Sequence, residues 1–182
     1  MNHNVVRTPR IRIKTTWVAL LAYCLSGGIG LPADDAPRRL LFSGITWHDK
    51  RELDNGTKLN MYNLGIGYER DYFKAYKKRY YTYHVMLLYD SNKKPYVYLA
   101  GSESIRFHQP RFDVSIGLAG FVGVKYIRHN SDGYKYSPII GLAPTSSFYI
   151  SDYTLNFAYI PGIDFGDYKT IGFLYLYAGW EF

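Results

Sequence analysis

The chain has 182 residues, and that length allows one domain, large enough to bury a core or to close a single small barrel. Its formal net charge of +7 is not the signature of a nucleic-acid-binding protein, because residues 1–33 hold four basic and no acidic residues and leave a net charge of +3 for the rest. The single cysteine, Cys24, excludes an intrachain disulfide. Twenty tyrosines and ten phenylalanines are more large rings than a soluble domain needs, and such rings are typical of membrane-spanning β-barrels, where they form belts at both interfaces.

The first 33 residues are predicted to be a signal peptide. A basic start precedes a short apolar run over 15–25 and a stretch rich in Ser and Gly, an order typical of secretory signals. The apolar run is shorter than the roughly 20 residues of a membrane-spanning helix. We expect cleavage near Ala33, which leaves 34–182 as one exported domain. An uncleaved anchor and lipid attachment at Cys24 are the alternatives.

Eight segments after residue 38 alternate between apolar and polar or small side chains with the period of a β-strand. In the segment 61–70, Tyr62 and Leu64 share one face, whereas Asn63 and Gly65 share the other. No segment shows a sustained period of 3.6 residues, so almost no helix is expected. The predicted strands lie near 40–52, 59–71, 79–90, 95–107, 111–127, 134–142, 146–160 and 168–182.

Eight antiparallel strands can close into a soluble lipocalin-like barrel or into an outer-membrane barrel. The last predicted strand favours the membrane, because Leu174 and Trp180 make one face apolar while Tyr175 and Tyr177 make the other face aromatic. Lipid outside and an apolar pocket inside explain both faces. The sequence therefore predicts an all-β fold, an eight-stranded antiparallel transmembrane β-barrel with an apolar interior pocket.

Few residues are candidates for catalysis. His48 ends the motif Ile-Thr-Trp-His, and Asp90 and Ser91 follow the predicted strand 79–90. A His, an Asp and a Ser can together perform acyl transfer, although an Asp-Ser pair is also common in plain turns. The remaining histidines show no metal-ligand spacing, so neither a metal nor a cofactor is expected.

From about residue 40 to Phe182 the sequence resembles the lipid A palmitoyltransferase family (the PagP type). The resemblance implies transfer of a palmitoyl chain from a glycerophospholipid to lipid A in the outer leaflet of the outer membrane. It also implies a modified lipopolysaccharide that gives resistance to cationic antimicrobial peptides, and we expect the enzyme to be a monomer. The shared motifs are, in order, Ile45-Thr46-Trp47-His48, Tyr62-Asn63 with Gly65-Ile66-Gly67, Asp90-Ser91, Gly117-Leu118, Gly120, Gly123-Val124 and Tyr159-Ile160-Pro161-Gly162.

The family's catalytic His, Asp and Ser match His48, Asp90 and Ser91. We expect His48 to be the base, since its reference pKa near 6.5 lets it accept a proton at neutral pH. Asp90 is expected to orient His48 or to stabilise its charged form. Ser91 either stabilises the oxyanion or acts as the nucleophile.

The resemblance also implies residues that bind the substrate. Gly101 matches, after one gap in the preceding loop, the glycine at the floor of the acyl pocket. Pro144 and Pro161 match the prolines beside a lateral opening, where a missing N–H interrupts the strand ladder. The family's proline at a second opening is replaced by Ser43, next to Gly44.

Three other functions stay open at this point, and one of them is that of an inactive member of the enzyme family that only binds lipid. A non-catalytic eight-stranded outer-membrane barrel, an adhesion or stability protein, predicts a polar or salt-bridged interior. A periplasmic lipocalin-like binder predicts polar outer faces on the strands.

Overall fold

The structure is a computed structural model that describes residues 36–50, 52, 56, 58–75, 79–91, 93–129, 133–162, 164–165, 168–169 and 171–182. The predicted signal peptide, 1–33, lies outside the described residues. The described residues form strands and their connections, and none of them belongs to a helix long and apolar enough to cross a membrane.

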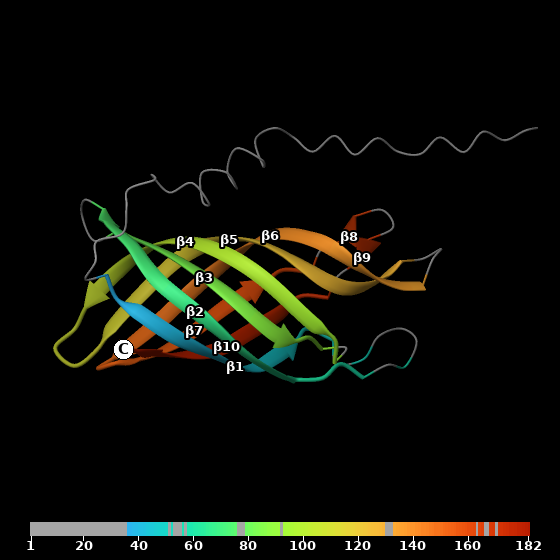
Figure 1. Cartoon of the computed structure of the whole chain (residues 1–182), viewed down its shortest axis with the longest axis horizontal. Coiled ribbons are helices and arrows are strands. Elements are labelled where there is room, and N and C mark those ends of the chain that lie inside the picture. Colours follow the sequence, from blue (N-terminus) through green and yellow to red (C-terminus); the bar gives the residue numbers. More distant parts are fainter. Residues whose placement is uncertain are drawn as a thin grey trace, which may run out of the picture.

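Eight long strands form one closed barrel (Figure 1), and every pair of neighbours is antiparallel. Each strand pairs with the next along the chain, and the first pairs with the last, so the predicted all-β barrel is confirmed. Two short strands, β8 (Asp164–Phe165) and β9 (Tyr168–Lys169), form a separate hairpin before the last strand. The barrel strands are β1 (Arg38–His48), β2 (Tyr62–Ala75), β3 (Arg79–Tyr89), β4 (Pro95–His108), β5 (Asp113–His129), β6 (Gly133–Ile150), β7 (Tyr153–Ile160) and β10 (Phe173–Glu181).

Two predicted strand boundaries are wrong. A break was expected between 134–142 and 146–160, but β6 runs through Pro144, which pairs with Leu118 of β5. The turn comes instead at 151–152, where Ser151 has a φ of 51°, a left-handed conformation that tight hairpin turns require. The last strand begins at Phe173 rather than at residue 168, because 164–169 fold into the β8–β9 hairpin.

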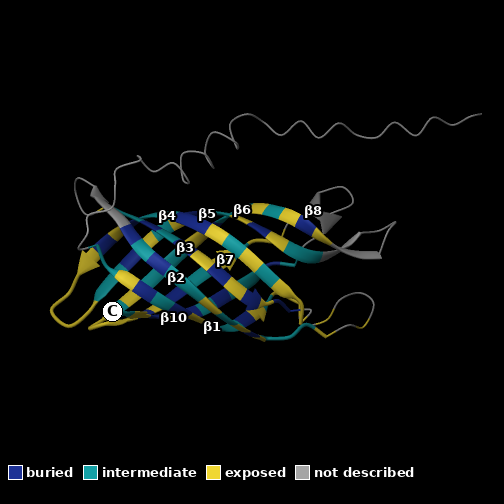
Figure 2. Cartoon of the chain, viewed as in Figure 1, coloured by how far each residue is buried: buried dark blue, intermediate teal, exposed yellow. Residues whose placement is uncertain are grey.

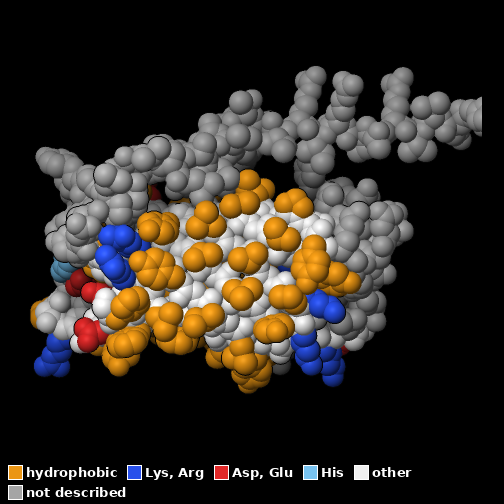
Figure 3. Space-filling model, viewed as in Figure 1, with side chains coloured by type: hydrophobic (Ala, Val, Ile, Leu, Met, Phe, Trp, Pro, Cys, Tyr) orange, Lys and Arg blue, Asp and Glu red, His pale blue; other side chains and the backbone are white. Residues whose placement is uncertain are grey.

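The outer face of the barrel is apolar. Along β2, Tyr62 and Leu64 are each 69% exposed, whereas Asn63 and Glu69 on the other face are buried. Figure 2 shows the same alternation of exposed and buried residues on neighbouring strands, and Figure 3 shows hydrophobic side chains spread over the middle of the visible face. Soluble monomers rarely expose so much apolar surface, so this face suits lipid and excludes the lipocalin-like alternative.

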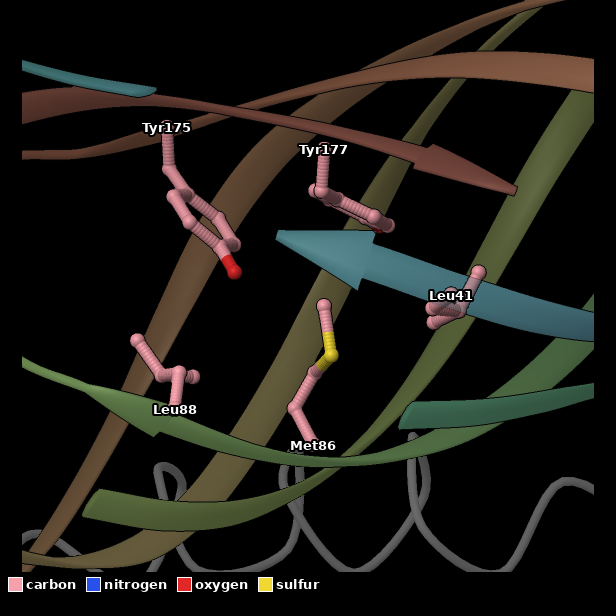
Figure 4. Close-up of a cluster of buried hydrophobic side chains, with 5 residues drawn as sticks. All are labelled: Leu41, Met86, Leu88, Tyr175 and Tyr177. Carbon is pink, nitrogen blue, oxygen red and sulfur yellow. The ribbon is translucent and has the colours of Figure 1, made fainter. Parts of the chain in front are cut away.

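An apolar cluster fills the half of the interior that lies toward His48 (Figure 4). Glycines on β2 make room for it, since a Cβ added at Gly65 would collide with Leu88 and one added at Gly67 would collide with Met86. We refer to this set as the lumen cluster, and it consists of Leu41, Met86, Leu88, Tyr175 and Tyr177.

The other half of the interior is charged. Arg39, only 1% exposed, lies 3.0 Å from Glu69, 3.1 Å from Asp71 and 3.0 Å from Glu181. Arg106 lies 3.6 Å from Asp71. The expected apolar interior pocket is therefore not shown, because the ends of β1, β2 and β10 bring these distant charges together inside the barrel.

A cavity of about 20 Å³ separates the two halves, a volume that suits a single water molecule. Most of the residues that line it are polar and it is too small for an acyl chain, so it is not the predicted acyl pocket. The cavity is lined by Glu69, Thr82, His84, Ser102, Ser104, Ser115, Ala119, Thr145, Ser147, Tyr149 and Tyr177.

Candidate active site

His48 and Ser91 meet at one end of the barrel. His48 is the last residue of β1, and Ser91 lies in the turn after β3, so β2 separates the two strands. The Oγ atom of Ser91 lies 2.8 Å from Nε2 of His48. This is the distance at which an imidazole can take a proton from a hydroxyl. The structure thus brings together two of the residues predicted from the sequence.

The segment before β2 holds both partners. The His48 ring makes a hydrogen bond with the backbone of Asn60, and the Asn60 N–H donates to the backbone carbonyl of Ser91 over 3.1 Å. Phe173 supports the ring from the lumen side, with ring centroids 5.7 Å apart. A hydrogen bond to one ring nitrogen fixes the orientation of the ring, and Nε2 is the nitrogen that faces Ser91.

Asp90 shapes the turn that presents Ser91. It is buried, and its Oδ1 accepts the backbone N–H of Lys94 over 3.0 Å. Its backbone carbonyl accepts the N–H of Lys93 over 2.9 Å. These two hydrogen bonds of Asp90 hold the turn, and its charge also acts on Lys125. Within the described part of the chain, no three His, Cys, Asp or Glu residues are placed to hold a metal ion.

Asn63 belongs to the site although the sequence assigned it no role. Its Nδ2 donates to Oγ1 of Thr46 over 2.6 Å and lies 3.4 Å from Oγ of Ser91. Asn63 is 5% exposed, and its Oδ1 is buried without a hydrogen-bond partner among the described residues. The available signal was a polar side chain on the small inward face of 61–70, but contact with Ser91 depends on the pairing of β1, β2 and β3.

Lys125 is a second residue that sequence analysis missed. Its Nζ lies 5.8 Å from the ring centroid of Tyr96 and 5.7 Å from that of Phe173. It is close enough for its charge to act on both His48 and Asp90. The only signal in the sequence was a lysine in phase with the inward-facing small residues of β5.

Gly101 is buried on β4, in the phase of the strand that points outward. On β4 the outward-facing set includes Leu99 and Ile105, each 44% exposed, and Gly101 is in phase with them. The inward positions beside it are Ala100, which is buried, and Ser102. The match depended on one gap in the loop, and a shift of one residue moves a strand position from the inner to the outer face.

Pro144 and Pro161 lie where the ladder between β6 and β7 stops. The pairing runs from Ile150 and Tyr153 to Thr145 and Ala158. Pro144 is the next residue of β6, which continues to pair with β5, and Pro161 directly follows β7. The interruption lies toward the His48 end of the barrel. Around Ser43, by contrast, the β1–β2 pairing continues across a bulge.

The comparison with known protein families assigns the chain. The family described as "Antimicrobial peptide resistance and lipid A acylation protein PagP" matches residues 33–176. The chain belongs to this family. The family is one of outer-membrane acyltransferases that modify lipid A. No curated protein matches the chain.

Solved structures of other outer-membrane barrels have a similar fold. Neisserial surface protein A is 10% identical, with a TM-score of 0.49 over 81% of this chain and 96% of that one. Ail of Yersinia pestis is 12% identical, with a TM-score of 0.41 over 81% and 100%. The N-terminal barrel of Pseudomonas aeruginosa OprF is 13% identical, with a TM-score of 0.43 over 80% and 97%. Similarity at this level carries no information about function.

Proposed function

We propose that the protein transfers a palmitoyl chain from a glycerophospholipid to a hydroxyl of lipid A in the outer leaflet. Membership of the family supports acylation of lipid A. The observation that carries the proposal is the 2.8 Å contact between Ser91 Oγ and His48 Nε2. Export by a cleaved signal peptide over 1–33 and action as a monomer are parts of the same proposal.

The lengths of the connections between strands support an orientation in which the His48 end of the barrel faces the outer leaflet. The connections 49–61 and 161–172 lie at the His48 end, whereas the short turns 109–112 and 151–152 lie at the other end. Outer-membrane barrels carry their longer loops outside and their short turns on the periplasmic side. His48 and Ser91 then face the outer leaflet, the expected location of the acceptor.

In the proposed reaction His48 is the general base. Its Nε2 accepts the proton of the attacking hydroxyl, a new ester forms, and the donor ester breaks. The protonated ring then returns the proton to the departing lysophospholipid oxygen. Two roles of Ser91 are compatible with the geometry. Ser91 can lose its proton to His48 and attack the donor ester as the nucleophile, or it can donate a hydrogen bond to the oxyanion of the tetrahedral intermediate.

The acyl chain needs space that the lumen cluster now fills. We place its path through the interruption between β6 and β7, beside Pro144 and Pro161. Inside the barrel the chain would lie among the lumen cluster, whose side chains must move apart. Met86 is suited to such a movement because its unbranched thioether adapts its shape readily.

The test is mass spectrometry of lipid A from cells that express wild type, His48→Ala or Ser91→Ala. Folding and membrane insertion of each variant are checked, and Ser115→Ala serves as a matched control, since Ser115 is a buried lumen serine of the polar cavity. Wild type and the control should add one palmitoyl unit, and the two site variants should not. A gain that survives both substitutions would remove the site from the proposal. Intact-protein mass spectrometry of the wild-type protein separates the two roles of Ser91, because it detects an acyl group on Ser91 if Ser91 is the nucleophile.

A non-catalytic barrel is the second candidate, and the salt-bridged half of the interior around Arg39 favours it. It predicts unchanged lipid A in cells that carry folded wild-type protein in the outer membrane.

A further inference from the structure

Lys125 lies inside the barrel near His48 and contacts a ring from a strand that is not its neighbour. It stands on β5, whereas Phe173, whose ring centroid lies 5.7 Å from the amine, stands on β10. The strands β6 and β7 lie between these two in the barrel. The Phe173 ring also contacts His48, at 5.7 Å between centroids. The amine and the imidazole are thus neighbours across one aromatic ring.

The amine has aromatic partners, and no ion pair of Lys125 is found among the described side chains, whereas Arg39 and Arg106 each have one. Asp90 is a carboxylate whose charge acts on Lys125, and its Oδ1 accepts the Lys94 N–H. A lysine inside a barrel without a direct ion pair is costly. The rings of Tyr96 and Phe173 offset only part of that cost, so the position favours an anion.

The position of Lys125 matches the path of the donor lipid. In the β5–β6 register Lys125 pairs with Ser137. Ser137 belongs to 133–144, the part of β6 that lies beyond the last β6–β7 pair, Thr145 and Ala158. The amine therefore lies next to the part of β6 that has no β7 partner, where the proposed lipid path enters the barrel.

We propose that Lys125 binds a phosphate group of a lipid substrate, and that this phosphate is the phosphodiester of the glycerophospholipid donor. The inference rests on the proposed function. In such a donor the acyl ester and the phosphate share one glycerol unit, so an ester placed on His48 and Ser91 brings its phosphate to a group directly across Phe173. The phosphates of lipid A are the other source of the same chemistry.

The experiment separates donor from acceptor by removing phosphate from each in turn. Purified protein transfers palmitate from a phosphatidylcholine or from a diacylglycerol, to lipid A with or without its phosphates. The variants are Lys125→Met, which removes the charge, and Lys125→Arg, which keeps it. Lys58→Met is the control, an exposed lysine in the connection from β1 to β2.

We expect Lys125→Met to lower kcat/KM about tenfold with phosphatidylcholine, mainly through KM, because one charge-assisted contact is lost. Transfer from diacylglycerol should fall much less, because without a donor phosphate the loss of the charge acts only through His48, and Lys125→Arg and Lys58→Met should keep the wild-type preference between the two donors. Equal loss with both donors, or no loss with either, would overturn the inference. Loss that follows the phosphates of lipid A would keep the phosphate site and overturn its assignment to the donor.

A binding measurement keeps this inference separate from the proposed function. Labelled short-chain phosphatidylcholine is bound to the His48→Ala protein with Lys125 intact or changed to Met. Weaker binding in the double variant supports the phosphate site even if no acyl transfer is seen with wild type, an outcome that would overturn only the proposed function. Equal binding by the two proteins contradicts the phosphate site.

Discussion

Replacing Arg39 by methionine is expected to destabilise the barrel by about 3 kcal/mol, the lower end of the cost of breaking a buried ion pair. Methionine has a similar length and is apolar, so the packing of the side chain is largely kept while its charge is lost. The result is a test of whether the charged half of the interior holds the barrel together.

The magnitude follows from the surroundings of Arg39. Its guanidinium contacts Glu69 at 3.0 Å and Asp71 at 3.1 Å, and these two side chains are only 6% and 9% exposed. Without Arg39 they become buried charges close to each other. Glu181, whose side chain is 40% exposed, can return to water, and Arg106 remains 3.6 Å from Asp71, so we expect the lower rather than the upper end of the range.

The assay is urea unfolding of refolded protein in detergent micelles, followed by fluorescence and by gel mobility. Arg79→Met is the matched control, because Arg79 makes a similar 3.1 Å pair with Glu103 but its side chain is 56% exposed. An exposed pair contributes at most about 1 kcal/mol. The difference between the two variants should shrink at low pH, where protonated carboxyls no longer repel each other.

Equal unfolding midpoints for Arg39→Met and Arg79→Met would refute this reasoning. Water in the lumen would then screen the cluster as well as bulk solvent does, and the network would contribute no more than surface charges.

Three further predictions concern the site, the lumen and a turn. Asn63→Ala should lower kcat about tenfold to a hundredfold with little change in KM, because Ser91 loses the N–H group 3.4 Å from its Oγ and is held less well. Met86→Ala should cost about 2–5 kcal/mol of stability, since this residue is fully buried, and should admit longer acyl donors, whereas Gly101→Met, on the outer face, should leave the donor profile unchanged. Ser151→Val should cost about 1–2 kcal/mol because a β-branched residue is strained at a φ of 51°.

Each of these has a measurement that can contradict it. For Asn63→Ala, a rise in KM without a fall in kcat, measured by steady-state kinetics, would contradict the prediction. For the lumen, donors of different chain length are offered in competition. The prediction is contradicted if Gly101→Met shortens the preferred chain and Met86→Ala leaves it unchanged. For the turn, the urea unfolding midpoint of Ser151→Val is compared with that of Ser151→Gly, the unstrained control. Equal midpoints for the two variants would show that backbone strain is not the cause of the destabilisation.

Sequence analysis predicted the strands and their faces because the strand period is local. Alternation along 61–70 was sufficient to put Leu64 and Asn63 on opposite faces, and in the structure Leu64 is exposed and Asn63 is buried. It failed around Pro144, where a break between two predicted strands was expected. The pairing of Pro144 with Leu118 keeps β6 continuous, and that pairing is a property of the neighbouring strand rather than of the segment itself.

The candidate site divides in the same way. The residue types and the family motifs were sufficient to propose His48 and Ser91, and the structure places them in contact. The motifs did not predict the contact of Asn63 with Ser91 or that of Lys125 with Phe173. Both contacts join different strands, which only the folded barrel brings together.

What the sequence by itself determined is the fold class and the chemistry of the candidate site, since both are expressed in short-range patterns and residue types. Only the tertiary structure decided which interior half is apolar and which is charged. Arg39, Glu69 and Glu181 are distant along the chain, and they meet because β1 pairs with β2 on one side and with β10 on the other. The same closure turned Gly101 outward, because register across the barrel, rather than position in a motif, sets the direction in which a strand residue points.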